Sequence, residues 1–154
     1  MSTHKDHADV KVHPPILTMA FIMAAYLLYW LRPILLPLPL VQWLGLGLVA
    51  GGFLLGVAAF LAFRKARTTL NPHGKVSAIV TDGVYRYSRN PIYLGFLLML
   101  VGFPLNSGNI WGVILAPLFV LAMNRLVIEK EEAYLEKKFR EAYADYRSRV
   151  RRWL

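Results

Sequence analysis

Residues 41–63 have the sequence VQWLGLGLVAGGFLLGVAAFLAF, a run of 23 residues in which Gln42 is the only strongly polar side chain. As a helix this run is about 34 Å long, against a hydrocarbon core of about 30 Å, so we expect it to cross a membrane. Its five glycines superficially resemble a dinucleotide-binding loop. Because they lie inside an apolar span with no preceding strand, we interpret them as points of close helix packing.

The composition of the whole chain agrees with a membrane protein. The chain has 154 residues, of which 56% are hydrophobic and 18% are charged, whereas soluble domains average about 45–50% and about 25%. A disordered chain is therefore excluded, and a water-soluble globular protein is disfavoured. The absence of cysteine excludes disulfides, thiolate metal sites and cysteine nucleophiles, and we expect no metal site.

Three further apolar runs accompany this span. The first, residues 15–31, carries no charge. The last two, of about 14 residues each, are separated by the turn signal Asn-Ser-Gly-Asn at 106–109. This pattern predicts a helical hairpin whose second arm continues past Met123. We expect four membrane spans, at about 15–37, 41–63, 91–105 and 109–128.

The positive charges indicate the cytoplasmic side. The net charge is +9, and 15 of the 18 lysines and arginines lie in residues 64–89 and 125–152. With four spans, both segments and both termini lie on one side, which the positive-inside rule makes the cytoplasm. This placement explains the basic excess without a nucleic-acid partner. The predicted fold is an all-α integral membrane protein of the cytoplasmic membrane, with an exposed arm at 1–14 and a single domain at 15–154.

The segment after the fourth span is predicted to be an amphipathic cytosolic helix over residues 129–154. Such a helix lies against a membrane face or against the protein's own cytosolic surface. We expect Glu136 and Arg140 to form an i,i+4 pair on its solvated face. The apolar stripe recurs at steps of three and four, at Leu135, Phe139, Tyr143, Tyr146, Val150 and Trp153.

The connection over residues 64–90 is too long for a simple linker between two spans. The dipeptide DG at 82–83 marks a turn, and SRNP at 88–91 marks a helix start, with Ser88 or Asn90 as the capping residue. The free backbone N–H groups at this helix start, beside the arginines of the same segment, are suited to a carboxylate or a phosphate.

Three glutamates begin the tail. On a regular helix Glu131 shares a stripe with Asn124, whereas Glu129 and Glu132 lie about 100–120° away. We therefore expect Glu131 to face inward and the other two glutamates to face water. The hairpin returns Glu131 to the helix start at 88–91, so we expect the two segments to enclose one nucleotide-sized cavity at the cytosolic boundary of the membrane.

These two segments resemble a known group of enzymes. The sequence TDGVYRYSRNPIYLG at 81–95, the Glu-Glu pair at 131–132 and the ending RVRRW at 149–153 are similar to the isoprenylcysteine carboxyl methyltransferase and phospholipid N-methyltransferase families. Those families are integral-membrane enzymes that use S-adenosylmethionine. The resemblance covers about residues 68–154 and implies a methyltransferase with its cofactor pocket beneath the cytosolic ends of the last two spans.

The resemblance also implies the residues of the site. Residues that match the family's pocket positions are Ser77, Ala78, Ile79, Val80, Tyr85, Asn90, Pro91, Ile92, Tyr93 and Glu131. Glu131 and Arg89 are the expected catalytic residues. Where the carboxyl methyltransferases have an arginine one turn before the glutamate, this chain has Val127. Arg125 and Glu129 are the candidate substrate-binding residues.

Methyl transfer from a sulfonium depends mainly on alignment and on exclusion of water. The expected acceptor is lipid-borne or small and hydrophobic, such as an isoprenylcysteine carboxylate or a phospholipid amine, and it reaches the site from the membrane lipid. For an amine, Glu129, Glu131 or Glu132 can accept the proton. Two other classes stay open: an NADPH-dependent membrane reductase of the sterol-reductase kind, and a non-enzymatic adaptor whose basic tail binds anionic lipid.

Overall fold

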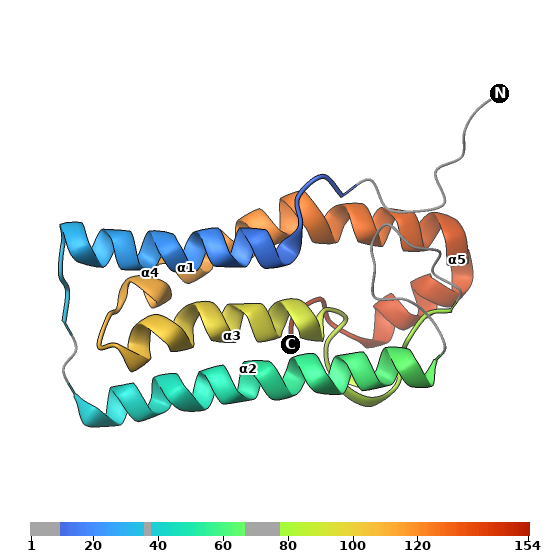
Figure 1. Cartoon of the computed structure of the whole chain (residues 1–154). Coiled ribbons are helices and arrows are strands. Elements are labelled where there is room, and N and C mark those ends of the chain that lie inside the picture. The colour runs from blue at the N-terminus through green and yellow to red at the C-terminus, as the bar shows by residue number, and fades with distance from the viewer. Residues whose placement is uncertain (1–9, 36–37, 67–77) are drawn as a thin grey trace.

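The computed structural model describes residues 10–35, 38–66 and 78–154, and within them every regular element is helical (Figure 1). This agrees with the predicted all-α class. The elements in chain order are α1 (Pro14–Leu31), α2 (Pro39–Lys65), the 3₁₀ turn η1 (Gly83–Arg86), α3 (Pro91–Asn106), α4 (Trp111–Met123), the π-helical turn η2 (Asn124–Ile128) and α5 (Glu129–Arg149).

Among the described residues, three helices are long and apolar enough to cross a membrane: α1, α2 and the run Trp111–Arg149, which is made by α4, η2 and α5. The apolar helix α3 is shorter, with 16 residues. The helices α3 and α4 form the predicted hairpin, and its second arm continues past Met123 as expected. The first helix ends at Leu31, because Pro33 disfavours helical backbone at the residue before it. The number of four crossings stays a prediction.

The turn between α3 and α4 fastens the hairpin to α1. Gly108 has a φ of +73°, a left-handed conformation that glycine adopts without steric cost. The buried side chain of Asn109 donates from Nδ2 to the carbonyl oxygen of Ala25 at 3.2 Å, and its Oδ1 accepts the N–H of Trp111 at 2.8 Å. The turn predicted at 106–109 is thus confirmed.

The helices α2 and α3 pack closely through glycines. Gly45 and Gly52 are seven residues apart, nearly two turns, and therefore lie on one face of α2. A Cβ atom added at Gly52 lies 2.6 Å from the carbonyl oxygen of Gly95, and one added at Gly102 lies 2.7 Å from that of Gly45. At Gly47 an added Cβ meets nothing within 4 Å. The interpretation of close helix packing is confirmed at Gly45 and Gly52.

The last helix changes register and direction. The π-helical turn η2 accommodates about one extra residue, which rotates the following residues by about 100°. Glu132 is consequently buried, with 7% of its surface exposed, so the prediction that it faces water is wrong.

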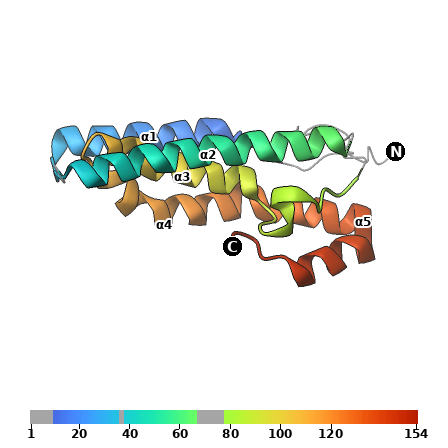
Figure 2. The same ribbon diagram turned by 90° about the horizontal axis from the view of Figure 1, so that it is seen from below.

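The helix α5 is broken at Arg140, where φ is +43°, and its last turns run back beside η1 (Figure 2). Because of this break, Glu136 pairs with Arg147 at 3.4 Å and not with Arg140 as predicted.

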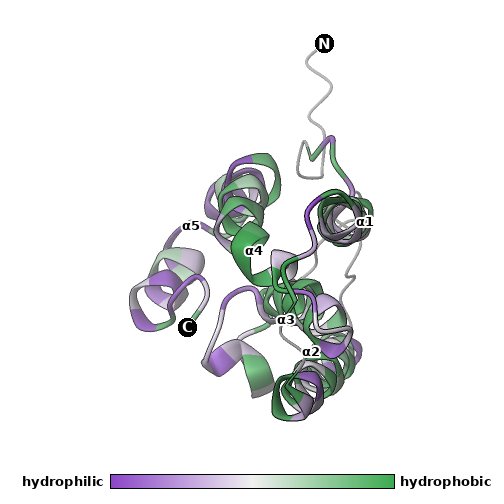
Figure 3. Cartoon of the chain, turned by 90° about the vertical axis from the view of Figure 1, so that its left-hand side faces the viewer, coloured by the Kyte–Doolittle hydropathy of each residue, from purple (hydrophilic) through white to green (hydrophobic). Residues whose placement is uncertain are grey.

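The tail helix packs on the protein itself. Tyr143 and Tyr146, two members of the predicted stripe, are buried. Figure 3, a view along the bundle, shows hydrophilic colouring on α5 beside the hydrophobic α4. The buried tyrosines face the start of α3 and η1, since they bond to Arg89 and Tyr85. Contact of this helix with a membrane surface stays a prediction.

Candidate functional site

The helix α3 begins at Pro91, as the SRNP motif predicted. Asn90 occupies the capping position, but its side chain makes no capping hydrogen bond. Instead, the Oγ of Ser88 accepts the N–H of Asn90 at 3.1 Å, and the Nδ2 of Asn90 donates to the carbonyl oxygen of Arg152 at 3.0 Å. The side chain predicted to cap the helix therefore joins the start of α3 to the chain after α5.

In the first turn of α3, Tyr93 meets the start of α5. Its hydroxyl donates to the Oε1 of Glu131 at 2.7 Å. Burial raises the pKa of the Glu131 carboxyl from 4.5 to about 7; the hydrogen bond from Tyr93 opposes this rise, and the charge of Glu132 adds to it. The Glu131 carboxyl can therefore gain or lose a proton near neutral pH.

Glu132 lies between two arginines. Arg152 donates from Nε to Oε1 at 3.1 Å and from Nη2 to Oε2 at 2.6 Å, a bidentate pair. The Nη1 of Arg89 lies 3.1 Å from the same Oε1, and the side chains of Arg89 and Glu132 are each 9% exposed. The same Nη1 of Arg89 also donates a hydrogen bond to the hydroxyl of Tyr143 at 3.3 Å. Among the described residues, Glu131 is bonded by Tyr93 and by no arginine.

The short turn η1 places Tyr85 against α2. The turn predicted at 82–83 is confirmed by Gly83, whose φ is +62°. The buried ring of Tyr85 meets Phe63 edge-on, with centroids 5.5 Å apart. The hydroxyl of Tyr146 donates to the carbonyl oxygen of Tyr85 at 2.7 Å. Burial raises the pKa of both tyrosines, so both hydroxyls stay protonated. The apolar cluster around Tyr85 also contains Ala59, Val80 and Ile92.

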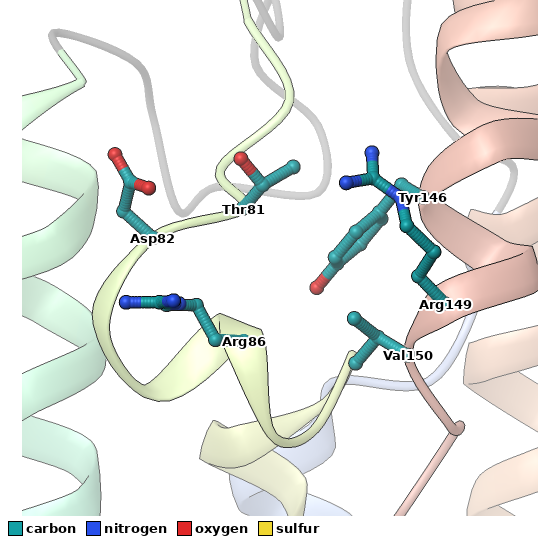
Figure 4. Close-up of a pocket in the computed structure, with 6 residues that line it drawn as sticks. All are labelled: Thr81, Asp82, Arg86, Tyr146, Arg149 and Val150. Carbon is teal, nitrogen blue, oxygen red and sulfur yellow. The ribbon is translucent and has the colours of Figure 1, made fainter.

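A hollow of about 500 Å³ opens between η1 and the end of α5 (Figure 4). Its lining consists of Thr81, Asp82, Arg86, Tyr146, Arg149 and Val150. None of the predicted cofactor residues that the structure describes lines this hollow, although Tyr146 connects it to Tyr85 through a hydrogen bond. The hollow is thus distinct from the cavity that we expected between Asn90 and Glu131.

The predicted cofactor and catalytic residues fall into two neighbouring groups. The polar group comes from the starts of α3 and α5 and contains Arg89, Asn90, Tyr93 and Glu131. The apolar group packs against α2 and contains Val80, Tyr85 and Ile92. Pro91 is buried at the first turn of α3, and Ala78 and Ile79 are half-buried in the chain that leads to η1. Ser77 lies outside the described residues.

The two candidate substrate-binding residues form a surface pair. The Nη1 of Arg125 lies 3.4 Å from the Oε2 of Glu129, and their side chains are 70% and 40% exposed. Val127, which stands between them in the chain, is fully buried. A role of this pair in holding an acceptor stays a prediction.

Sequence reasoning assigned no role to Arg152 or to the hydroxyl of Tyr143. The ending RVRRW at 149–153 is part of the family resemblance, and this resemblance was the one sequence feature that could have pointed to a role for Arg152. Because α5 ends at Arg149, helical periodicity does not identify the partner of a residue that follows it. Tyr143 was recognised only as part of an apolar stripe.

The chain is similar in sequence to known proteins. The profile of the phospholipid methyltransferase family matches residues 40–142. An uncharacterised protein of Haemophilus influenzae is similar, with 41% identity over 63 residues, which are 41% of this chain and 100% of that protein.

A protein-S-isoprenylcysteine O-methyltransferase of Schizosaccharomyces pombe is 38% identical over 72 residues. These residues are 47% of this chain and 30% of the yeast protein, so the similarity spans less than a third of that relative. No solved structure matches the chain.

Proposed function

The chain belongs to the phospholipid methyltransferase family, and from this premise we propose that it is an S-adenosylmethionine-dependent methyltransferase with a lipid-borne or small hydrophobic acceptor. The family and the three apolar helices make it a multi-pass membrane protein. In this proposal the chain crosses the cytoplasmic membrane four times, and the site and both termini face the cytoplasm, where most of the positive charge lies.

The observation that carries the proposal is the hydrogen bond between Tyr93 and Glu131. It joins the two segments that resemble the methyltransferases, the Asn-Pro-Ile-Tyr helix start and the Glu-Glu pair. These segments are separated by a hairpin of two apolar helices, and they meet at one end of the bundle (Figure 1). A partly buried carboxylate at this position is expected to need a positively charged partner.

The chemistry of the residues around Glu131 supports this cofactor. When bound, S-adenosylmethionine supplies a methyl group on a positively charged sulfonium. Because Arg89 and Arg152 both contact Glu132, the carboxylate of Glu131 is available to a cationic group. The neighbouring apolar cluster of Tyr85 and Ile92 suits a flat aromatic base. We therefore propose that the two neighbouring groups of predicted residues together hold the cofactor.

Glu131 is the proposed general base where the acceptor is an amine. Its pKa of about 7 suits proton transfer at neutral pH. Glu132 is less suited because two arginines hold its carboxylate, and Glu129 is paired with Arg125 at the surface. We propose that Arg89, the second predicted catalytic residue, acts through Glu132 and Tyr143, the groups that it contacts.

Calorimetry on the full chain in detergent micelles tests the proposal. We expect S-adenosylmethionine and its demethylated product to bind, and we expect Glu131→Ala and Asn90→Ala to weaken binding. Glu141→Ala is the matched control, because Glu141 is an exposed carboxylate on the same helix. Binding of NADPH alone supports the reductase class, and binding of anionic vesicles without either cofactor supports the adaptor. Labelled cofactor supplied with a membrane lipid extract then identifies the methylated product.

A further inference from the structure

The chain after α5 forms an extended segment, residues 150–153, which we call the C-terminal strap. Val150 ends the helix with extended backbone, φ −123° and ψ 131°. The strap returns to the start of α3 (Figure 1), where the carbonyl oxygen of Arg151 accepts the N–H of Arg89 at 3.0 Å. Further along, the Nε1 of Trp153 donates to the Oδ1 of Asn124 at 3.1 Å. The strap therefore links the start of α3 to the π-helical turn η2.

Arg152 contacts the candidate site through both its main chain and its side chain. Its carbonyl oxygen accepts hydrogen bonds from the Nδ2 of Asn90 at 3.0 Å and from the Oγ of Ser88 at 3.4 Å. Its guanidinium binds the carboxylate of Glu132 in bidentate fashion. One residue thus holds a side chain from the start of α3 and a side chain from the start of α5.

The bidentate pair makes the two adjacent glutamates different: Glu132 is held by arginine, whereas Glu131 has no arginine contact among the described residues. Glu132 is 7% exposed, and a buried carboxylate needs compensating charge and hydrogen bonds. Arg89 supplies one contact to its Oε1, and Arg152 supplies one contact to each oxygen. If Arg152 is lost, the Oε2 of Glu132 has no remaining partner among the described residues, and the side chain becomes free to compete with Glu131 for positive groups.

We propose that Arg152 is a positioning residue of the methyltransferase site, which saturates Glu132 and orients Asn90 so that Glu131 alone is presented to a cationic ligand. This inference rests on the proposed function for the identity of the ligand. The contacts of the strap stand independently of it.

The test compares Arg152→Gln and Arg152→Lys with Arg151→Gln in the full chain. The side chain of Arg151 is exposed, and its strap contact uses the main chain, which glutamine retains. We expect Arg152→Gln to weaken S-adenosylmethionine binding by about tenfold or more, the effect of losing a charge-assisted contact. Arg152→Lys is expected to lose less, because an ammonium keeps the charge without the bidentate geometry. Arg151→Gln is expected to bind as the wild type does.

A second readout separates positioning from general loss of structure. The infrared absorption of the protonated Glu131 carboxyl gives its titration midpoint, assigned by its disappearance in Glu131→Gln. We expect the midpoint to rise in Arg152→Gln, because the charge of Glu132 is then less compensated. In the double variant Glu132→Gln/Arg152→Gln we expect the same binding loss as in Glu132→Gln alone, since Arg152 acts through Glu132. Additive losses contradict the proposal.

The two readouts also distinguish failure of this inference from failure of the proposed function. If the wild type binds no S-adenosylmethionine but the midpoint rises in Arg152→Gln and not in Arg151→Gln, the positioning role holds and the cofactor assignment fails. If the wild type binds and Arg152→Gln changes neither the affinity nor the midpoint, the positioning role is refuted.

Discussion

Replacing Glu131 by glutamine should change the pH dependence of stability in a direction that the structure determines. Glutamine keeps the shape of the side chain and can still accept the hydrogen bond from Tyr93, but it does not ionise. The comparison therefore isolates the free-energy cost of holding an ionised carboxylate at this partly buried position.

The size of the effect follows from the pKa. Burial raises the pKa of Glu131 from 4.5 to about 7, and each pKa unit corresponds to about 1.4 kcal/mol, so the full difference is about 3 kcal/mol. Because the folded-state pKa is the higher one, the stabilisation by the bound proton is complete below about pH 4.5 and is lost as the pH rises through about 7. Glu131→Gln should therefore match the wild type at low pH and be more stable at high pH.

Thermal unfolding in detergent, followed by circular dichroism, measures this difference. At about pH 8 we expect the midpoint of Glu131→Gln to exceed that of the wild type by about 6 °C or more, and at about pH 5 we expect only a small difference. Glu141→Gln, at an exposed position of the same helix, should show no pH-dependent difference. An equal shift at both pH values, or a larger one at pH 5, would refute the argument from burial.

Two further substitutions test neighbouring contacts. Tyr93→Phe removes the hydroxyl that donates to Glu131 at 2.7 Å and opposes the rise in its pKa, so the infrared titration midpoint of Glu131 should move upward by about one pH unit; a downward shift contradicts this. Gly52→Ala should destabilise the protein by about 1–3 kcal/mol in thermal unfolding, because the new Cβ lies 2.6 Å from the carbonyl oxygen of Gly95. The matched control Gly47→Ala, where nothing lies within 4 Å, should be neutral or stabilising by up to about 1 kcal/mol, and equal losses at both glycines would show that contact with α3 is not the cause.

Features that depend on neighbouring residues were predictable from the sequence. Proline in the first turn placed the start of α3, and the DG and NSGN signals placed turns at Gly83 and Gly108. The glycines of α2 were recognised as packing positions, but the sequence did not separate Gly52, which contacts α3, from Gly47, where an added Cβ meets no described atom within 4 Å. That distinction depends on the rotation of α2 relative to its partner.

The division between Glu131 and Glu132 shows where periodicity stops being informative. On a regular helix these two neighbours point about 100° apart, and the sequence stripe favoured Glu131 as the buried one. The π-helical turn η2 changes the phase just before them, so both approach the start of α3, one at Tyr93 and the other at Arg89. Where most side chains are apolar, inserting one residue into a helix turn hardly changes the pattern of polar and apolar positions. The helical periodicity of the sequence therefore does not reveal the π-helical turn.

By itself the sequence determined the helical membrane class, the helix start at Pro91 and the family, because apolar length, turn residues and a contiguous motif are local properties of the chain. Only the tertiary structure decided that Arg152 reaches Glu132 and Asn90. That contact depends on the break at Arg140 and on the return of the chain beyond α5. Its free energy comes from groups far apart in sequence, whose proximity is set by the packing of the whole bundle.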